Sequence, residues 1–97
     1  MKTCQTLEEL RAAIDEVDDQ IVALIAERNQ YIKQAAKFKK TIEEIKSDDR
    51  MEQVINRVRH KALMQGVSPN LLARIYQIMI DEMVESEIAE FRNTKVF

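Results

Sequence analysis

The 97-residue sequence has one glycine, one proline, one cysteine and no tryptophan, and each scarcity excludes something. With so few turn-forming residues the chain cannot make the many tight turns of a β-sandwich or barrel, so long helices are expected. A single cysteine excludes an internal disulfide, which fits a reducing compartment. No apolar run approaches the ~18 residues of a membrane span, and no signal-peptide type of stretch opens the sequence. We expect a cytoplasmic protein.

Charge and length limit the function further. Charged residues make up 33% of the chain, yet the formal net charge is only −2, which leaves no basic footprint for nucleic acid. Hydrophobic residues make up 45%, too many for a disordered chain. The length suits a single domain over residues 1–97.

A heptad pattern dominates the first half of the sequence. Thr6 and Glu9 have the T-x-x-E spacing of a capping box, in which each side chain satisfies a backbone donor at a helix start. From there the pattern predicts one uninterrupted helix over residues 7–45, because eleven of its twelve a and d residues are apolar. These twelve residues are Leu7, Leu10, Ile14, Val17, Ile21, Leu24, Arg28, Tyr31, Ala35, Phe38, Ile42 and Ile45.

Two shorter helices are predicted after it. Asp49 and Glu52 have the spacing of a second capping box, which predicts a helix over residues 49–65 that ends at Gly66. Ser68 and Pro69, as N-cap and first-turn residue, then predict a helix over residues 69–92.

The fold class is therefore all-α, with three helices and a frayed tail over residues 92–97. The first helix would be about 58 Å long, at 1.5 Å per residue. A compact globule of this chain length spans only ~35 Å, so the shorter helices cannot cover the apolar seam. We expect a two-fold symmetric homodimer in which a second copy covers it.

Arg28 is the polar residue that interrupts the seam, between Leu24 and Tyr31. Burying a guanidinium without a partner costs several kcal/mol. One reading is a buried salt bridge or a polar residue that fixes helix register. The other is an anion-binding group inside the bundle, because Arg matches a carboxylate with two hydrogen bonds.

Two further cations lie on the same predicted helix. On a continuous helix, Lys39 would be rotated only ~20° about the helix axis from Arg28 and lie ~16 Å further along that axis. Both side chains could then converge on a small ligand. Arg11 would be rotated about 100° about the helix axis from Arg28 and lie ~25 Å away along it. Arg11 and Arg28 of the same chain are therefore too far apart to bind one small ligand. In an antiparallel dimer, Arg11 of one chain approaches Arg28 of the other, which makes each site shared.

Glu87 and Arg50 each allow two interpretations. Glu87 lies one turn from Met83 and one from Phe91, where burial favours a protonated carboxyl that can donate a hydrogen bond. A salt bridge to one of the cations would act in the opposite direction, and both readings stay open. Arg50 flanks the apolar face of the second helix, or is simply a surface residue. Inward cations without an evident base, nucleophile or metal set indicate a small dianionic ligand and no cofactor.

The sequence resembles the all-helical chorismate mutases (AroQ class) and the related isochorismate-pyruvate lyases. The resemblance covers nearly the whole chain and implies an intertwined homodimer of three-helix chains (chorismate mutase II-like) with two active sites. Its core is Leu10-Arg11-x-x-Ile14-Asp15-x-x-Asp18-x-x-Ile21-x-x-Leu24-Ile25-Ala26-Glu27-Arg28, followed by Lys37-Phe38-Lys39.

The resemblance also implies roles for the cations. Arg11 from the partner subunit and Arg28 would bind the two substrate carboxylates. Lys39 would donate to a carboxylate and to the ether oxygen of chorismate, and Arg50 would be a further cation over the site. Chorismate rearranges to prephenate in one pericyclic step, so the protein need only hold a reactive conformer and stabilise developing charge.

Two residues depart from the family pattern. Glu87 matches a position that is typically Gln, whose side chain donates to the ether oxygen. Met51 stands where typical mutases carry a Glu that contacts the ring hydroxyl, and with Met83 it would line the site. An apolar residue at position 51 is more typical of the lyases, as are residues 35–39.

Chorismate mutase is accordingly the predicted function. The alternative enzyme is an isochorismate-pyruvate lyase, which forms salicylate and pyruvate with the same cations. The alternative of another class is a non-catalytic dimeric helical binding module, which an ionised Glu87 would favour because a carboxylate repels the ether oxygen. Against that module, a plain packing surface has no reason to keep Arg28 on an apolar seam.

Overall fold

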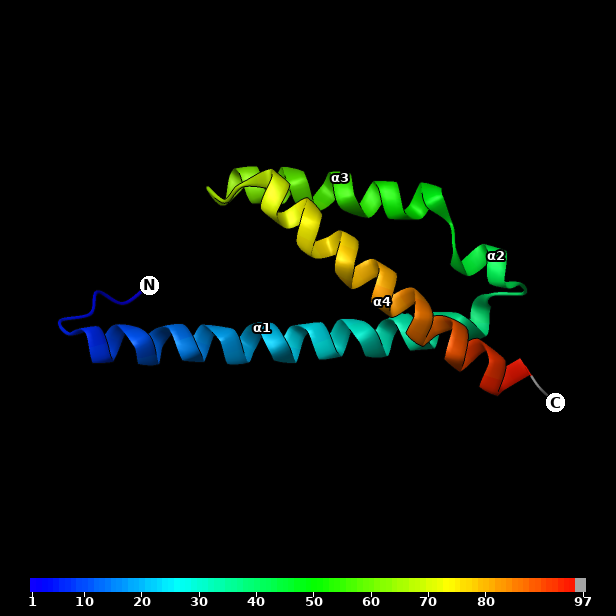
Figure 1. Ribbon diagram of the computed structural model, residues 1–97, viewed down its shortest axis with the longest axis horizontal. Helices are drawn as coiled ribbons and strands as arrows, with labels where there is room; N and C mark the ends of the chain where they lie inside the picture. The colour runs from blue at the N-terminus through cyan, green and yellow to red at the C-terminus, as the bar shows by residue number, and fades with distance from the viewer. Residues whose placement is uncertain (96–97) are drawn as a thin grey trace. The chain divides into compact units, whose positions relative to one another are not determined.

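The computed structural model describes residues 1–95, in which all regular secondary structure is helical and no strand occurs (Figure 1). This confirms the predicted all-α fold class; residues 96–97 of the predicted tail lie outside the described residues. The chain divides into two units, Met1–Tyr31 and a second that begins at Ile32, and each is described by itself. The elements are α1 (Leu7–Ala35), the 3-10 turn η1 (Ala36–Phe38), α2 (Ile42–Ile45), α3 (Asp48–Met64) and α4 (Pro69–Lys95).

The predicted capping box opens α1. The backbone N–H of Glu9 donates to Thr6 Oγ1 at 3.0 Å. The Glu9 carboxylate in turn accepts from the backbone N–H of Gln5 at 2.9 Å. Thr6 thereby satisfies one N–H of the first turn, and Glu9 satisfies the N–H of the residue before the N-cap, which together fix the start of the helix.

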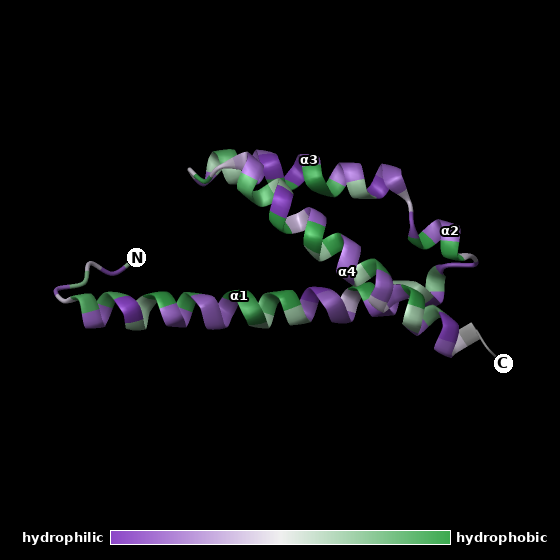
Figure 2. Ribbon diagram, in the orientation of Figure 1, coloured by the Kyte–Doolittle hydropathy of each residue, from purple (hydrophilic) through white to green (hydrophobic). Residues whose placement is uncertain are grey.

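The heptad seam of α1 is exposed in the single chain. Figure 2 shows hydrophobic bands repeating along the helix between hydrophilic ones, and no residue of α1 is buried. The exposed fractions reach 60% at Leu7, 53% at Val17 and 63% at Leu24. The amphipathic pattern thus gives a helix with one apolar face, which the helix by itself leaves exposed.

The prediction of one helix over residues 7–45 is wrong, because α1 ends at Ala35. After η1 the backbone of Lys39 is extended, with φ −96° and ψ 145°, so Lys39 does not continue the helical lattice of α1. The angular relation between Arg28 and Lys39 that assumed a continuous helix consequently does not apply.

A local cap accounts for this break. Thr41 is the N-cap of α2, and its Oγ1 accepts from the backbone N–H of Glu44 at 3.3 Å. The Glu44 carboxylate accepts from the backbone N–H of Lys40 at 3.1 Å. Thr41 and Glu44 thus repeat the T-x-x-E spacing of Thr6 and Glu9. A cap favours a new helix start at this point, although the apolar heptad continues through it.

The start of α3 also differs from the prediction. Ser47, not Asp49, is the N-cap, and its Oγ accepts from the backbone N–H of Arg50 at 3.4 Å. The proposed box between Asp49 and Glu52 is therefore wrong. The serine comes one residue before the helix and leaves Asp48 and Asp49 in its first turn, where negative charge is favourable.

The end of α3 is the predicted glycine turn. Gly66 has φ 73°, a conformation that side-chain-bearing residues rarely adopt. The N–H of Val67 donates to the Ala62 carbonyl at 2.9 Å, and that of Gly66 to the Leu63 carbonyl at 3.3 Å. These two bonds form a Schellman motif and reverse the chain into α4.

The second unit is built around α4. Ser68 caps it as predicted, accepting from the backbone N–H of Leu71 at 3.3 Å, and the helix runs to Lys95, past the predicted end at residue 92. Helices α2 and α3 and the turn η1 all pack on it. Among the residues whose burial is described, one charged residue, Glu87, shares the core. The buried hydrophobic residues are Ala36, Ile45, Ala62, Ile80, Met83 and Ile88.

Candidate active site

The buried carboxylate of Glu87 is paired with Lys39. Glu87 lies on α4 with only 5% of its surface exposed. Lys39 Nζ donates to Glu87 Oε2 at 3.1 Å, with the Lys39 side chain 28% exposed. Of the two readings of Glu87, the chain on its own adopts the salt bridge. Because η1 packs on α4 and ends directly before Lys39, the break in the first predicted helix brings this ammonium to Glu87.

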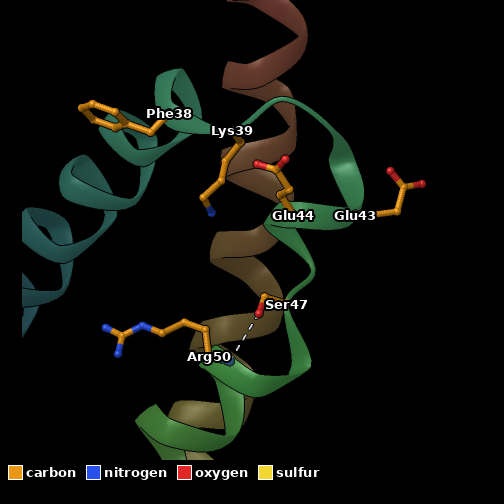
Figure 3. Close-up of a pocket in the computed structure, with 6 residues that line it drawn as sticks. All are labelled: Phe38, Lys39, Glu43, Glu44, Ser47 and Arg50. Atoms are coloured by element: carbon orange, nitrogen blue, oxygen red, sulfur yellow. Dashed lines mark hydrogen bonds between the residues drawn. The ribbon is translucent and has the colours of Figure 1, made fainter.

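An open pocket of about 680 Å³ adjoins this pair. Figure 3 shows Lys39 entering it from the segment after η1 and Arg50 from the first turn of α3, while Glu43 points away from both. Its lining residues are Phe38, Lys39, Glu43, Glu44, Ser47 and Arg50.

Several polar groups of the pocket are already engaged in local structure. Ser47 Oγ accepts from the helix backbone, and the Glu44 carboxylate accepts from Lys40. Within residues 1–95, no hydrogen bond or ion pair engages the Arg50 guanidinium. A guanidinium and a partly exposed ammonium that line one pocket suit a small anion with carboxylate groups.

The sequence profile of the chorismate mutase type II family matches residues 10–88. The chain belongs to this family. A chorismate mutase from Methanocaldococcus jannaschii is similar to it, with 35% identity over 78 residues that cover 79% of each chain. The predicted resemblance is thus confirmed, and with it membership of an isomerase family.

The family match spans the predicted cations and Glu87, and the structure divides them between the two units. Lys39, Arg50 and Glu87 lie in the second unit, where Lys39 lines the pocket and also contacts Glu87. Arg11 and Arg28 lie on α1 in the first unit, Arg11 exposed and Arg28 half-buried. The convergence of all five on one chorismate mutase site stays a prediction.

The two methionines expected at the site differ in how deeply they are buried. Met83 is buried in the core, one turn before Glu87 on α4. Met51 is half-buried and follows Arg50 on α3. Neither is among the residues that line the open pocket.

Sequence reasoning missed part of this pocket. The heptad pattern places Phe38 on the apolar seam, but its side chain is 78% exposed and lines the pocket. The pattern assigns no site role to Glu43, Glu44 or Ser47. The T-x-x-E signal at Thr41 was present and would have identified the segment that carries them.

Two general properties complete the description. In residues 1–95, no three His, Cys, Asp or Glu side chains are grouped so that they could hold a metal ion. Among the same residues, no helix combines the length and the apolar character that crossing a membrane requires.

Proposed function

We propose that this chain catalyses the rearrangement of chorismate to prephenate. Family membership and the chorismate mutase of Methanocaldococcus jannaschii support the reaction. The observation that carries it in this chain is the placement of two cations, Lys39 and Arg50, from separate segments on one pocket next to buried Glu87. That arrangement suits a small substrate with two carboxylates and an ether oxygen.

For the rearrangement of chorismate, the protein needs only to bind the substrate and to stabilise the charge that develops on it. In one step the C–O bond of the ether breaks while a C–C bond forms, and negative charge develops on the oxygen. No proton has to be removed, so neither a base nor a nucleophile is needed. Lys39 stabilises the developing charge, and Arg28 with Arg50 holds the reactive conformer.

The proposed active unit is a homodimer with shared sites. The exposed seam of α1 supports a second copy as its cover, because soluble proteins rarely leave such a long apolar face in water. In this arrangement Arg11 from the partner subunit binds the substrate carboxylate that Arg28 does not. Sedimentation is expected to give twice the chain mass, and a stable monomer at micromolar concentration contradicts the shared site.

A cytoplasmic location also stays a prediction.

Met51 favours a second candidate, the isochorismate-pyruvate lyase. A thioether cannot make the contact with the ring hydroxyl that the Glu of typical mutases makes. Isochorismate carries this hydroxyl at a different carbon, so the half-buried Met51 is the residue that distinguishes the two substrates.

A paired turnover assay tests the proposal. Purified protein is offered chorismate and isochorismate separately, at about pH 5 and about pH 7.5. Prephenate from chorismate is the expected result. Salicylate and pyruvate from isochorismate, with little prephenate, identify the lyase. No turnover of either substrate refutes both enzymes and supports the non-catalytic binding module.

A further inference from the structure

Lys39 lies in a short irregular segment between two helical elements. The turn η1 ends at Phe38 and α2 begins at Ile42, so residues 39–41 lie outside both. The backbone of Lys39 is extended, with φ −96° and ψ 145°. Such a segment lacks the repeating hydrogen bonds of a helix, so the direction of the Lys39 side chain depends on what fixes its backbone.

The peptide groups on both sides of Lys39 are hydrogen bonded. Its own N–H donates to the Ala36 carbonyl at 3.2 Å, which closes the turn η1. The N–H of Lys40 donates to Glu44 Oε2 at 3.1 Å, and the N–H of Glu44 donates to Thr41 Oγ1 at 3.3 Å. The bond on the second side therefore depends on one side chain, that of Glu44. Figure 3 shows this carboxylate turned toward the segment that carries Lys39.

Buried residues anchor the two flanking elements on α4. Ala36 of η1 is 0% exposed, and Ile45 at the end of α2 is 5% exposed. Both elements pack on α4, the helix that carries Glu87. Because Glu44 directly precedes Ile45, the carboxylate that holds the Lys40 N–H is attached to a packed helix. The capping box thus connects the segment around Lys39 to a fixed part of the second unit.

The charge of Glu44 is a disadvantage at this place. Glu44 lines the pocket proposed for a substrate with two carboxylates, and like charges repel each other. Its carboxylate is instead engaged within the chain, by the backbone of Lys40. The hydrogen bond that Glu44 accepts, and not its charge, therefore accounts for a role at this site.

We infer that Thr41 and Glu44 are positioning residues for Lys39. Their capping box fixes residues 39–41 and so directs the Lys39 ammonium toward Glu87 and into the pocket. Neither residue needs to touch the substrate for this role. What the ammonium does in the reaction rests on the proposed function, whereas its placement at Glu87 is measurable without substrate.

The contact between Lys39 and Glu87 provides that measurement. A double-mutant cycle of Lys39→Met and Glu87→Gln, followed by urea unfolding at one fixed protein concentration, yields the coupling of the two side chains. The same cycle is then measured in the background of Glu44→Ala. The coupling is expected to fall by at least about half, because the backbone that carries the ammonium is no longer held. Glu44→Gln is expected to keep it, because the amide oxygen still accepts from the Lys40 N–H.

Turnover of chorismate is the second measurement. Glu44→Ala is expected to lower kcat for prephenate formation at least about tenfold, because a displaced ammonium stabilises the developing charge less well. Glu44→Gln keeps the box and is expected to keep kcat. Its KM is not expected to rise, because the substitution removes a charge that repels the substrate.

Thr41 provides a second pair of variants, which decides the matter if Glu44→Ala unfolds. Thr41→Ala removes the other half of the box and is expected to lower both the coupling and kcat. Thr41→Ser restores an oxygen that caps the helix and is expected to restore both. Far-ultraviolet circular dichroism checks that each variant keeps its helices.

Ser68→Ala is the matched control. It removes the corresponding cap of α4, where Ser68 Oγ accepts from the backbone N–H of Leu71 at 3.3 Å. The proposed site has no residue at this helix start. The variant is expected to lower the free energy of unfolding, as loss of a cap does, and to leave the coupling and kcat at their wild-type values.

The outcomes separate the positioning from the proposed function. A coupling that Glu44→Ala leaves at the wild-type value overturns the inference, and so does an equal loss of coupling in Ser68→Ala. A kcat that falls equally in Glu44→Gln and Glu44→Ala also overturns it, because the charge and not the box then matters. If the wild type converts neither chorismate nor isochorismate, the enzyme is refuted. A coupling that Glu44→Ala lowers and Glu44→Gln keeps supports the positioning even then.

Discussion

The ammonium of Lys39 donates to the carboxylate of Glu87 at 3.1 Å, although the two residues lie 48 positions apart in the sequence. In this contact Glu87 accepts a hydrogen bond. The family resemblance instead assigns position 87 a donor, toward the ether oxygen of chorismate. A carboxyl group donates only when it is protonated, whereas an amide donates at every pH. An ion-paired Glu87 therefore cannot serve as that donor.

Glu87→Gln is expected to raise turnover of chorismate near neutral pH. A carboxylate that accepts from Lys39 cannot donate to the ether oxygen, whereas the amide of a glutamine can. The measurement is kcat for prephenate formation at about pH 7.5.

Glu85→Gln is the matched control for that variant. It makes the same chemical change at an exposed side chain on the same helix, α4, outside the residues that line the pocket. Its turnover should match that of the wild type. Turnover that Glu87→Gln leaves unchanged removes Glu87 from the reaction.

Lys39→Met is expected to lower the free energy of unfolding by about 1–3 kcal/mol, because it leaves the Glu87 carboxylate buried without its partner. Lys39→Met with Glu87→Gln should regain part of this loss. Urea unfolding at one fixed protein concentration measures both. Arg50→Met, at an exposed cation without a partner in residues 1–95, should cost less than about 0.5 kcal/mol. Equal losses for the two single variants contradict a stabilising ion pair.

Arg28→Ala is expected to reduce turnover at least about a hundredfold, because the proposed site uses this charged donor to hold a substrate carboxylate. The dimer should persist in a sedimentation experiment, because the proposed contact between the two copies involves the whole apolar seam and not one residue. Arg92→Ala, an exposed arginine near the end of α4, serves as the control and should keep wild-type turnover. Full activity in Arg28→Ala refutes the assignment of this residue to the site.

Thr41→Ala is expected to cost about 1 kcal/mol locally, because it removes the side chain that caps α2. Hydrogen exchange of the amides of residues 42–45 should accelerate, while that of α3 and α4 should stay unchanged. Thr3→Ala, at an exposed threonine before α1, provides a comparison. Unchanged exchange in α2 means that the cap does not hold this segment.

Local signals in the sequence predicted much of the fold. The capping box at Thr6, the serine before Pro69 and the glycine after α3 each act through groups a few residues away, so their effect can be read from spacing alone. The apolar heptad likewise predicted that α1 is a helix with one hydrophobic face. The same heptad predicted the wrong end for the first helix. The pattern describes only the apolar face of a helix and contains no information on the packing of η1 against α4, which replaces a continuous helix here.

By itself the sequence determined the all-helical class, the family, and the cations and carboxylate that the proposed site uses. The tertiary structure alone decided which of them meet. Whether Glu87 is a donor or an ion-pair partner depends on the break at residues 36–41, which brings the ammonium of Lys39 to α4. No spacing rule fixes such a contact, because it arises where distant segments pack against each other to bury apolar surface.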